Sequence, residues 1–178
     1  MFYPQERVAL LIDGVGITGV ARLLDRQVDF SKLRTMFASK ARLMTARYYT
    51  TVVEENDHAP LRPLLDYLGY NGYVVRTKPA RSFIDAEGRR KFKGSMNIEM
   101  AIDALQMAEN VDHIVIFSGD GDLCGLVEAL QRQGKRVSIC SSVKTQPQVA
   151  SDDLRRQADN FIEFADIAKD CHREPVAA

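Results

Sequence analysis

The stretch that most constrains the fold of this chain is VIFSGDGD, residues 115–122. An apolar run ends there in two acids, Asp120 and Asp122, that are separated by one glycine, and a helical pattern follows at once. An apolar run that ends in turn residues and leads into a helix is typical of a buried parallel strand. Open α/β sheets bind their ligands at the carboxyl ends of such strands. Two carboxylates repel each other unless a cation lies between them, so this stretch predicts half of a divalent-metal site.

The other half is expected at the first strand. Residues 7–12, RVALLI, form a second nearly continuous apolar run, and it ends in Asp13 and Gly14. If the carboxyl ends of these two strands are adjacent at the switch point of the sheet, Asp13 lies beside Asp120 and Asp122.

Strand-like runs alternate with helical patterns over the whole chain. Strands are expected at 7–12, 43–53, 73–77, 113–118, 136–140 and 160–164, and helices at 17–24, 30–39, 57–68, 96–107, 122–133 and 151–159. This alternation predicts an α/β fold, a three-layer αβα sandwich with a mainly parallel sheet of five to six strands. We expect a single domain over residues 1–168 and a disordered tail over residues 169–178. The apolar run 161–167 indicates a buried tail or a homodimer contact.

Composition narrows the partners and the compartment. The formal net charge is +0, so binding to nucleic acid would need a local basic patch. The three cysteines, Cys124, Cys140 and Cys171, include no Cys-x-x-Cys pair, which argues against a disulfide framework and structural zinc and favours a reducing compartment. No run of 18 apolar residues and no signal-peptide pattern is present, so we expect no membrane span and a cytoplasmic location.

A local basic patch does occur, at residues 76–93. Seven cationic side chains stand there against two acidic ones, around a tip at Ala86-Glu87-Gly88-Arg89 that indicates a hairpin or a long loop. A solvated surface loop is one interpretation of such a charge run. The other is an arm that contacts phosphates.

Two further motifs offer alternatives. Gly14, Gly16 and Gly19 match G-x-G-x-x-G directly after a strand, the pattern of dinucleotide-binding proteins. Asp13 would oppose a pyrophosphate there, and no acid follows the second strand at the right spacing, so no dinucleotide is expected. The acids after the fourth strand fit turn and helix-cap positions as well as they fit a metal site. An EF-hand is excluded, because its third acid and its glycine are missing at the required offsets.

Three segments together resemble a known family. IDG at residues 12–14, KGSMNIE at 93–99 and SGDGD at 118–122 resemble the NYN domain, and more narrowly the LabA-like (DUF88) group within the PIN-like nuclease superfamily. The segment 154–162 also resembles the last helix and strand of that group. The resemblance covers residues 5–168 and implies a PIN-like, Rossmann-like fold with a metal-dependent ribonuclease site.

The resemblance also implies roles for individual residues. The family's metal-binding acids fall on Asp13, Asp120 and Asp122, but the aspartate of its Lys-Gly-Asn-Met-Asp pattern falls on Asn97. The asparagine usual after the first strand falls on Gly16. An amide ligates without charge, so we expect Mg²⁺ or Mn²⁺ to bind more weakly than in a typical relative. Glu99 is a poor substitute, because it lies two residues from Asn97 and does not share its helix face.

Three hypotheses follow. The first is a Mg²⁺- or Mn²⁺-dependent endoribonuclease in which Asp13, Asp120, Asp122 and Asn97 bind metal; its RNA-binding residues are Lys78, Arg81, Arg90, Lys93 and Ser118. The second is a catalytically inactive RNA-binding or protein-interaction module with the same fold. The third is a nucleotide-binding Rossmann-like protein that uses Gly14, Gly16 and Gly19.

Overall fold

The computed structural model describes residues 2–53, 58–86 and 88–172. Its strands, in chain order, are β1 (Arg7–Asp13), β2 (Arg42–Val52), β3 (Val74–Pro79), β4 (Arg81–Ile84), β5 (Arg90–Lys93), β6 (His113–Phe117), β7 (Arg136–Ser141) and β8 (Asn160–Glu163). Its α-helices are α1 (Gly14–Leu23), α2 (Phe30–Ala38), α3 (His58–Tyr70), α4 (Asn97–Met107), α5 (Cys124–Arg132), α6 (Asp152–Gln157) and α7 (Phe164–Ile167). Short 3₁₀ helices, η1 (Ala108–Asn110) and η2 (Gly121–Leu123), follow α4 and precede α5.

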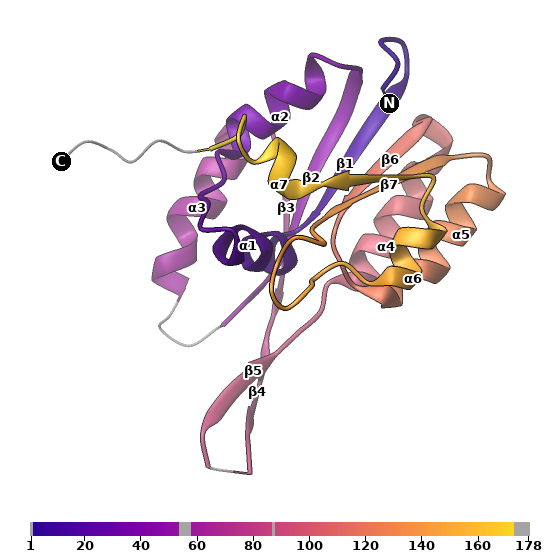
Figure 1. Ribbon diagram of the computed structural model, residues 1–178. Coiled ribbons are helices and arrows are strands. Elements are labelled where there is room, and N and C mark those ends of the chain that lie inside the picture. Colours follow the sequence, from indigo (N-terminus) through magenta and orange to yellow (C-terminus); the bar gives the residue numbers. More distant parts are fainter. Residues whose placement is uncertain (1, 54–57, 87, 173–178) are drawn as a thin grey trace.

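The predicted α/β sandwich is confirmed. Six strands form one sheet in the order β3-β2-β1-β6-β7-β8, and every neighbouring pair in it is parallel. Helices α1, α2 and α3 lie on one side of the sheet, and α4, α5 and α6 lie on the other (Figure 1). The apolar strand β6 is buried along its whole length, as expected for a strand covered on both faces.

Each face of the sheet has its own core. Alternate residues of β1 point to opposite faces, so Leu10 packs into the core under α1 and α2 while Leu11 packs into the core under α4 and α5. The chain remains packed to His172: Cys171 is buried and its carbonyl accepts a hydrogen bond of 2.8 Å from Asp29 N. Residues 171 and 172 of the expected tail thus contact the fold, and residues 173–178 lie outside the described residues. Within the apolar run 161–167, Phe164 is buried in the core, which supports a packed segment.

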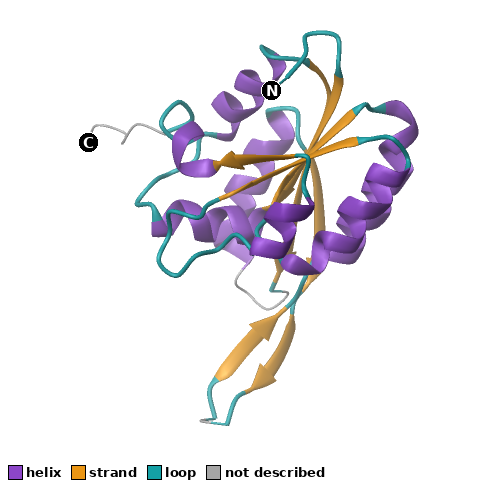
Figure 2. Ribbon diagram, turned by 45° about the vertical axis from the view of Figure 1, so that its right-hand side comes forward, coloured by secondary structure: helices purple, strands orange, loops and turns teal. Residues whose placement is uncertain are grey.

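The predicted hairpin is also present. Strands β4 and β5 pair antiparallel and project away from the sandwich (Figures 1 and 2). Gly88 closes the tip with a positive φ of 74°, a conformation that glycine adopts without a steric cost. The hairpin lies within the connection from β3 to α4. At its base Gly94 contacts β2 so closely that a Cβ atom there would lie 2.6 Å from Cγ2 of Thr51.

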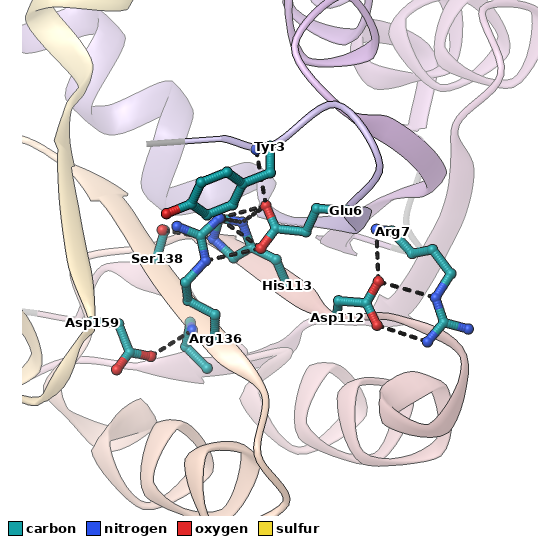
Figure 3. A network of polar contacts seen from close by, with 9 residues as sticks. Tyr3, Glu6, Arg7, Asp112, His113, Arg136, Ser138 and Asp159 are labelled. Atoms are coloured by element: carbon teal, nitrogen blue, oxygen red, sulfur yellow. Dashed lines mark hydrogen bonds and ion pairs between the residues drawn. The ribbon is translucent and has the colours of Figure 1, made fainter.

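Ion pairs join the strands at the end of the sheet opposite the predicted site (Figure 3). Arg7 on β1 makes hydrogen bonds to Asp112, just before β6, through its backbone N at 2.9 Å and its guanidinium at 2.7 and 3.1 Å. This guanidinium and the Arg7 backbone N–H lower the pKa of Asp112 to about 2. The pair holds the starts of two central strands in register.

A buried histidine belongs to the same network. Nδ1 of His113 accepts from Arg136, at 3.0 Å, because a guanidinium only donates. The neutral ring then donates through Nε2 to Oγ of Ser138, at 2.7 Å, while Glu6 pairs with Arg136. Burial and the charge of Arg136 lower the pKa of His113 to about 4, so the ring is neutral at pH 7.

Candidate functional site

The carboxyl ends of β1 and β6 are adjacent, as the sequence predicted. Ile12 and Phe117 pair across the two strands, and the sheet order reverses direction at this point. The hydroxyl of Ser118 donates to Oδ2 of Asp13 at 3.5 Å and accepts from the backbone N of Asp120 at 3.2 Å. The structure therefore brings two of the three predicted acids together around one serine.

Ser118 differs from its predicted role. Only 3% of the residue is exposed, and its hydroxyl bonds to the two aspartates on either side of it. We therefore reassign Ser118 from RNA contact to the positioning of Asp13 and Asp120. The following Gly119 is required by packing, because a Cβ there would lie 2.4 Å from the carbonyl oxygen of Val149.

Asp13 caps helix α1. Its Oδ1 accepts from the backbone N–H groups of Val15 and Gly16, both at 3.1 Å. This cap starts the helix at Gly14, three residues earlier than predicted, because a side-chain acceptor satisfies the first free donors of the helix. Burial raises the pKa of Asp13 and the charge of Asp120 raises it further, while the hydrogen bonds from Gly16, Val15 and Ser118 oppose the rise. The carboxylate is thus short of positive charge, which a cation could supply.

The first two glycines of the fingerprint have packing roles. A Cβ at Gly14 would lie 2.5 Å from the hydroxyl of Tyr48, and a Cβ at Gly16 would lie 2.5 Å from Oδ2 of Asp13. The Asp13 carboxylate therefore occupies the space that a side chain at position 16 would fill. The N–H groups that would bind a pyrophosphate are bonded to Asp13 instead.

Asn97 begins helix α4 and faces the acids. Its Nδ2 donates to Oδ2 of Asp120 at 2.7 Å. Asp120 caps the short helix η2, since its Oδ1 accepts from the backbone N of Asp122 at 3.0 Å. Asp122 is exposed and, with Asn97, lines one end of a groove of about 520 Å³ between α4 and α5. Asp122 thus contacts Asp120 through its backbone N–H, and its carboxylate lies on the exposed side of the site.

The residues fit a divalent ion in part. Asp13, Asp120 and Asn97 offer hard oxygen atoms, the type that Mg²⁺ and Mn²⁺ prefer. Over residues 2–53, 58–86 and 88–172, however, no group of three Asp, Glu, His or Cys side chains is arranged to hold a metal ion. This donor set suits an ion that keeps several water ligands better than one enclosed by the protein.

A polar network beside the site was not predicted. Asp103 of α4 is buried and accepts from Nη1 of Arg47 at 2.6 Å and from the hydroxyl of Tyr49 at 2.9 Å. Nε of Arg76 lies 3.5 Å from the same carboxylate. Burial opposes ionisation, but the hydrogen bonds from Arg47 and Tyr49 outweigh it and hold the pKa of Asp103 below its usual range. Tyr49 pairs with Asp13 in the sheet, so this network anchors α4 next to the acids.

The predicted RNA-binding cations separate into two groups. Nζ of Lys78 on β3 lies 2.8 Å from Oε1 of Glu99, so this lysine is engaged in an ion pair within the fold. Its ammonium group lowers the pKa of Glu99. Arg81, Arg90 and Lys93 are exposed on the hairpin, where the guanidinium of Arg90 donates to Oγ of Ser82 at 3.4 Å. The hairpin therefore presents exposed positive charge, while Lys78 and Arg76 of β3 are engaged in ion pairs with acids of α4.

Comparisons with known proteins show the family of this chain and support its fold. The NYN domain family matches residues 7–167. Low amplitude and bright protein LabA of Synechococcus elongatus is 31% identical over 171 residues, which cover 94% of this chain and 88% of that protein. A crystal structure of a protein of unknown function from Vibrio parahaemolyticus superposes with a TM-score of 0.70 at 25% identity, covering 89% of this chain and 93% of that one. In the described part of the chain, no helix is long and apolar enough to cross a membrane.

Proposed function

This chain belongs to the NYN domain family and is a homologue of LabA, which is consistent with the PIN-like nuclease superfamily; we therefore propose that it is a divalent-metal-dependent ribonuclease. The observation that carries the proposal is the Asp13–Ser118–Asp120 unit at the switch point between β1 and β6. The buried Ser118 hydroxyl donates there to the carboxylate of Asp13, at the end of β1, and accepts from the backbone N–H of Asp120, in the loop after β6. Open α/β sheets bind ligands at this position.

The metal site of this proposal consists of Asp13 and Asp120, with Asn97 as a neutral ligand and Asp122 at its open side. A Mg²⁺ or Mn²⁺ ion bound there would supply an activated water and would stabilise negative charge on a phosphoryl oxygen. A cation bound there would offset the burial and the charge of Asp120 that together raise the pKa of Asp13. Ser118 joins the Asp13 carboxylate to the backbone N–H of Asp120, and so connects the ends of β1 and β6 at the site.

The substrate class follows from the charge distribution. RNA is polyanionic, and the two acids repel it unless a metal ion or nearby cations compensate. The hairpin β4–β5 supplies exposed cations, and only residues 94–96 separate it from Asn97. RNA bound along the hairpin would thus be led toward the start of α4.

A second function is favoured by one specific contact. The Asn97 amide donates to Asp120, so it gives one carboxylate oxygen a hydrogen-bond partner where a typical relative would place a further acid. An RNA-binding or protein-interaction module without efficient hydrolysis would have this arrangement. The two functions share a fold and differ in whether a metal ion binds at the acids.

Cleavage of single-stranded RNA distinguishes them. We expect cleavage in Mn²⁺ or Mg²⁺ that stops when EDTA is added and falls at least 100-fold in Asp120→Asn. Asp66→Asn is the matched control, because Asp66 is an exposed acid of α3 that pairs only at 3.7 Å with Arg62. Cleavage that survives in Asp120→Asn, or no cleavage by the wild type in either metal, would contradict the ribonuclease proposal.

A further inference from the structure

The two faces of the hairpin β4–β5 differ in chemistry. Arg81 pairs with Lys93, and Ile84 pairs with Arg90, in the antiparallel register. Residues directly opposite in such a pair share a face, and so do residues two apart on one strand. One face therefore presents Arg81, Phe83 and Lys93, and the other presents Ser82, Ile84 and Arg90.

Phe83 is exposed between cations. Its exposed fraction is 46%, although a phenylalanine on a small soluble fold is usually buried. Arg81 lies two residues before it on the same face, and Lys93 lies across from Arg81. An aromatic ring flanked by cations on one exposed surface is the arrangement by which proteins bind single-stranded nucleic acid: bases stack on the ring while the cations contact phosphates.

The hairpin is a projecting element and not part of the core. It extends beyond the sandwich in both views, and its four paired positions per strand form a sheet of their own (Figures 1 and 2). An isolated two-stranded hairpin is at most marginally stable in water, so contacts with a ligand would add substantially to its order. Stacking requires an unpaired base, because the bases of an A-form duplex are covered by their neighbours.

We propose that the Arg81–Phe83–Lys93 face of the hairpin binds single-stranded RNA, with an unpaired base stacked on Phe83 and phosphates on Arg81 and Lys93. The inference rests on the proposed function for its choice of RNA, but it concerns binding and not cleavage. It makes Phe83 the residue that selects single strands over duplexes. Arg90, on the other face, has no direct part in this contact.

The chain itself allows a direct test, because it contains no tryptophan. Phe83→Trp places a single indole on the proposed face, and Ile84→Trp places one on the opposite face, at a position that is 73% exposed. Both full-length variants are titrated in EDTA with a 12-nucleotide single-stranded oligouridylate and with an RNA duplex of equal length. Thermal melting confirms that each variant is folded.

We expect the single strand to quench the emission of Phe83→Trp strongly and that of Ile84→Trp weakly, with little effect of the duplex. Phe83→Ala should weaken binding of the single strand about tenfold, by loss of one stacked base. Arg81→Gln and Lys93→Gln should each weaken binding. Each should also make the slope of log affinity against log salt concentration shallower by about one, because one phosphate contact is lost.

Three results would overturn the inference: an unchanged emission of Phe83→Trp when the oligonucleotide binds, equal quenching of both variants, or equal binding of single strand and duplex. If the emission of Phe83→Trp shifts to shorter wavelength with vesicles of anionic phospholipid but does not change with RNA, the hairpin binds a membrane surface and the proposal of RNA binding is overturned. The two proposals can fail separately. If the protein cleaves RNA but the emission of Phe83→Trp is not quenched, only the proposed hairpin contact is rejected. If the emission is quenched but no cleavage occurs in any metal, only the proposed ribonuclease activity is rejected.

Discussion

The side-chain amide of Asn97 donates a hydrogen bond of 2.7 Å to Oδ2 of Asp120. This contact joins the first residue of α4 to the loop after β6. The resemblance to the family implies an aspartate at position 97, where it would add a negative charge instead of a donor. With aspartate at position 97, two carboxylates would repel each other until a metal ion bound between them. With asparagine, a hydrogen bond forms in the absence of a metal ion.

Asn97→Asp should therefore make the protein depend more on metal. We expect the rise in Tm caused by 1 mM Mn²⁺ to be several degrees larger in this variant than in the wild type, because an added carboxylate increases metal affinity and binding stabilises the folded state. Thermal melting with and without Mn²⁺ measures this increment. Asn110→Asp makes the same charge change at an exposed position of η1 and should show the wild-type increment. An equal increment in both variants would contradict a metal site at Asn97.

Asp13 has two roles that substitutions can separate. Asparagine is also a good N-cap, so Asp13→Asn should keep helix α1 and remove an unfavourably buried charge, giving a Tm at least as high as that of the wild type. Asp13→Ala removes the cap as well, at a cost of about 1 kcal/mol or 2–4 °C in Tm. Both variants should lose Mn²⁺ binding in calorimetry. Wild-type Mn²⁺ affinity in Asp13→Asn would exclude this carboxylate as a ligand.

Gly16 controls where the Asp13 carboxylate lies. In Gly16→Ala the added methyl group would meet Oδ2 of Asp13, so the carboxylate must turn away and the Mn²⁺ affinity should change several-fold. Gly19→Ala is the matched control in the same helix, where a Cβ has open space. It should raise stability by about 0.5–1 kcal/mol, because alanine loses less backbone entropy, and leave metal binding unchanged. Unchanged Mn²⁺ affinity in both variants would show that position 16 has no influence on the acid.

The buried His113 predicts a loss of stability in mild acid. Folding lowers its pKa from 6.5 to about 4, so the unfolded chain binds the proton more tightly, and protonation favours unfolding. The free energy of unfolding should be constant above pH 7 and should fall by on the order of 1 kcal/mol per pH unit between pH 6.5 and 4. Urea titrations at pH 7, 6 and 5 measure this. His113→Gln should be less stable at pH 7, and its free energy of unfolding should change less with pH. A wild type that is equally stable at pH 7 and 5 would refute the prediction.

The parts of the site that could be predicted from the sequence are those with local signals. The acids after β1 and β6 follow buried apolar runs, and strand order at a switch point brings Asp13 toward Asp120. Helix α1 begins at Gly14, before the predicted residue 17, because the Asp13 cap outweighs the low helix propensity of Gly14 and Gly16.

The Asp103 network could not be predicted in detail, because it joins residues from β2, β3 and α4 that are far apart in the chain. A weak signal did exist: Arg47 is a charge inside a strand rich in tyrosine and threonine, and such a charge needs a partner. The burial of Ser118 likewise depends on tertiary packing, which single-sequence patterns do not reveal.

The insertion of the hairpin between β3 and α4 has a geometric consequence. Lys93 ends β5 and Asn97 begins α4, and Gly94 between them is seated on Thr51 of β2. The connection is short, and its first residue lies directly against the sheet. The hairpin and the first turn of α4, where Asn97 lies, are therefore joined by a connection of only residues 94–96. An insertion into this connection would change the spacing between the hairpin and Asn97 without altering either element.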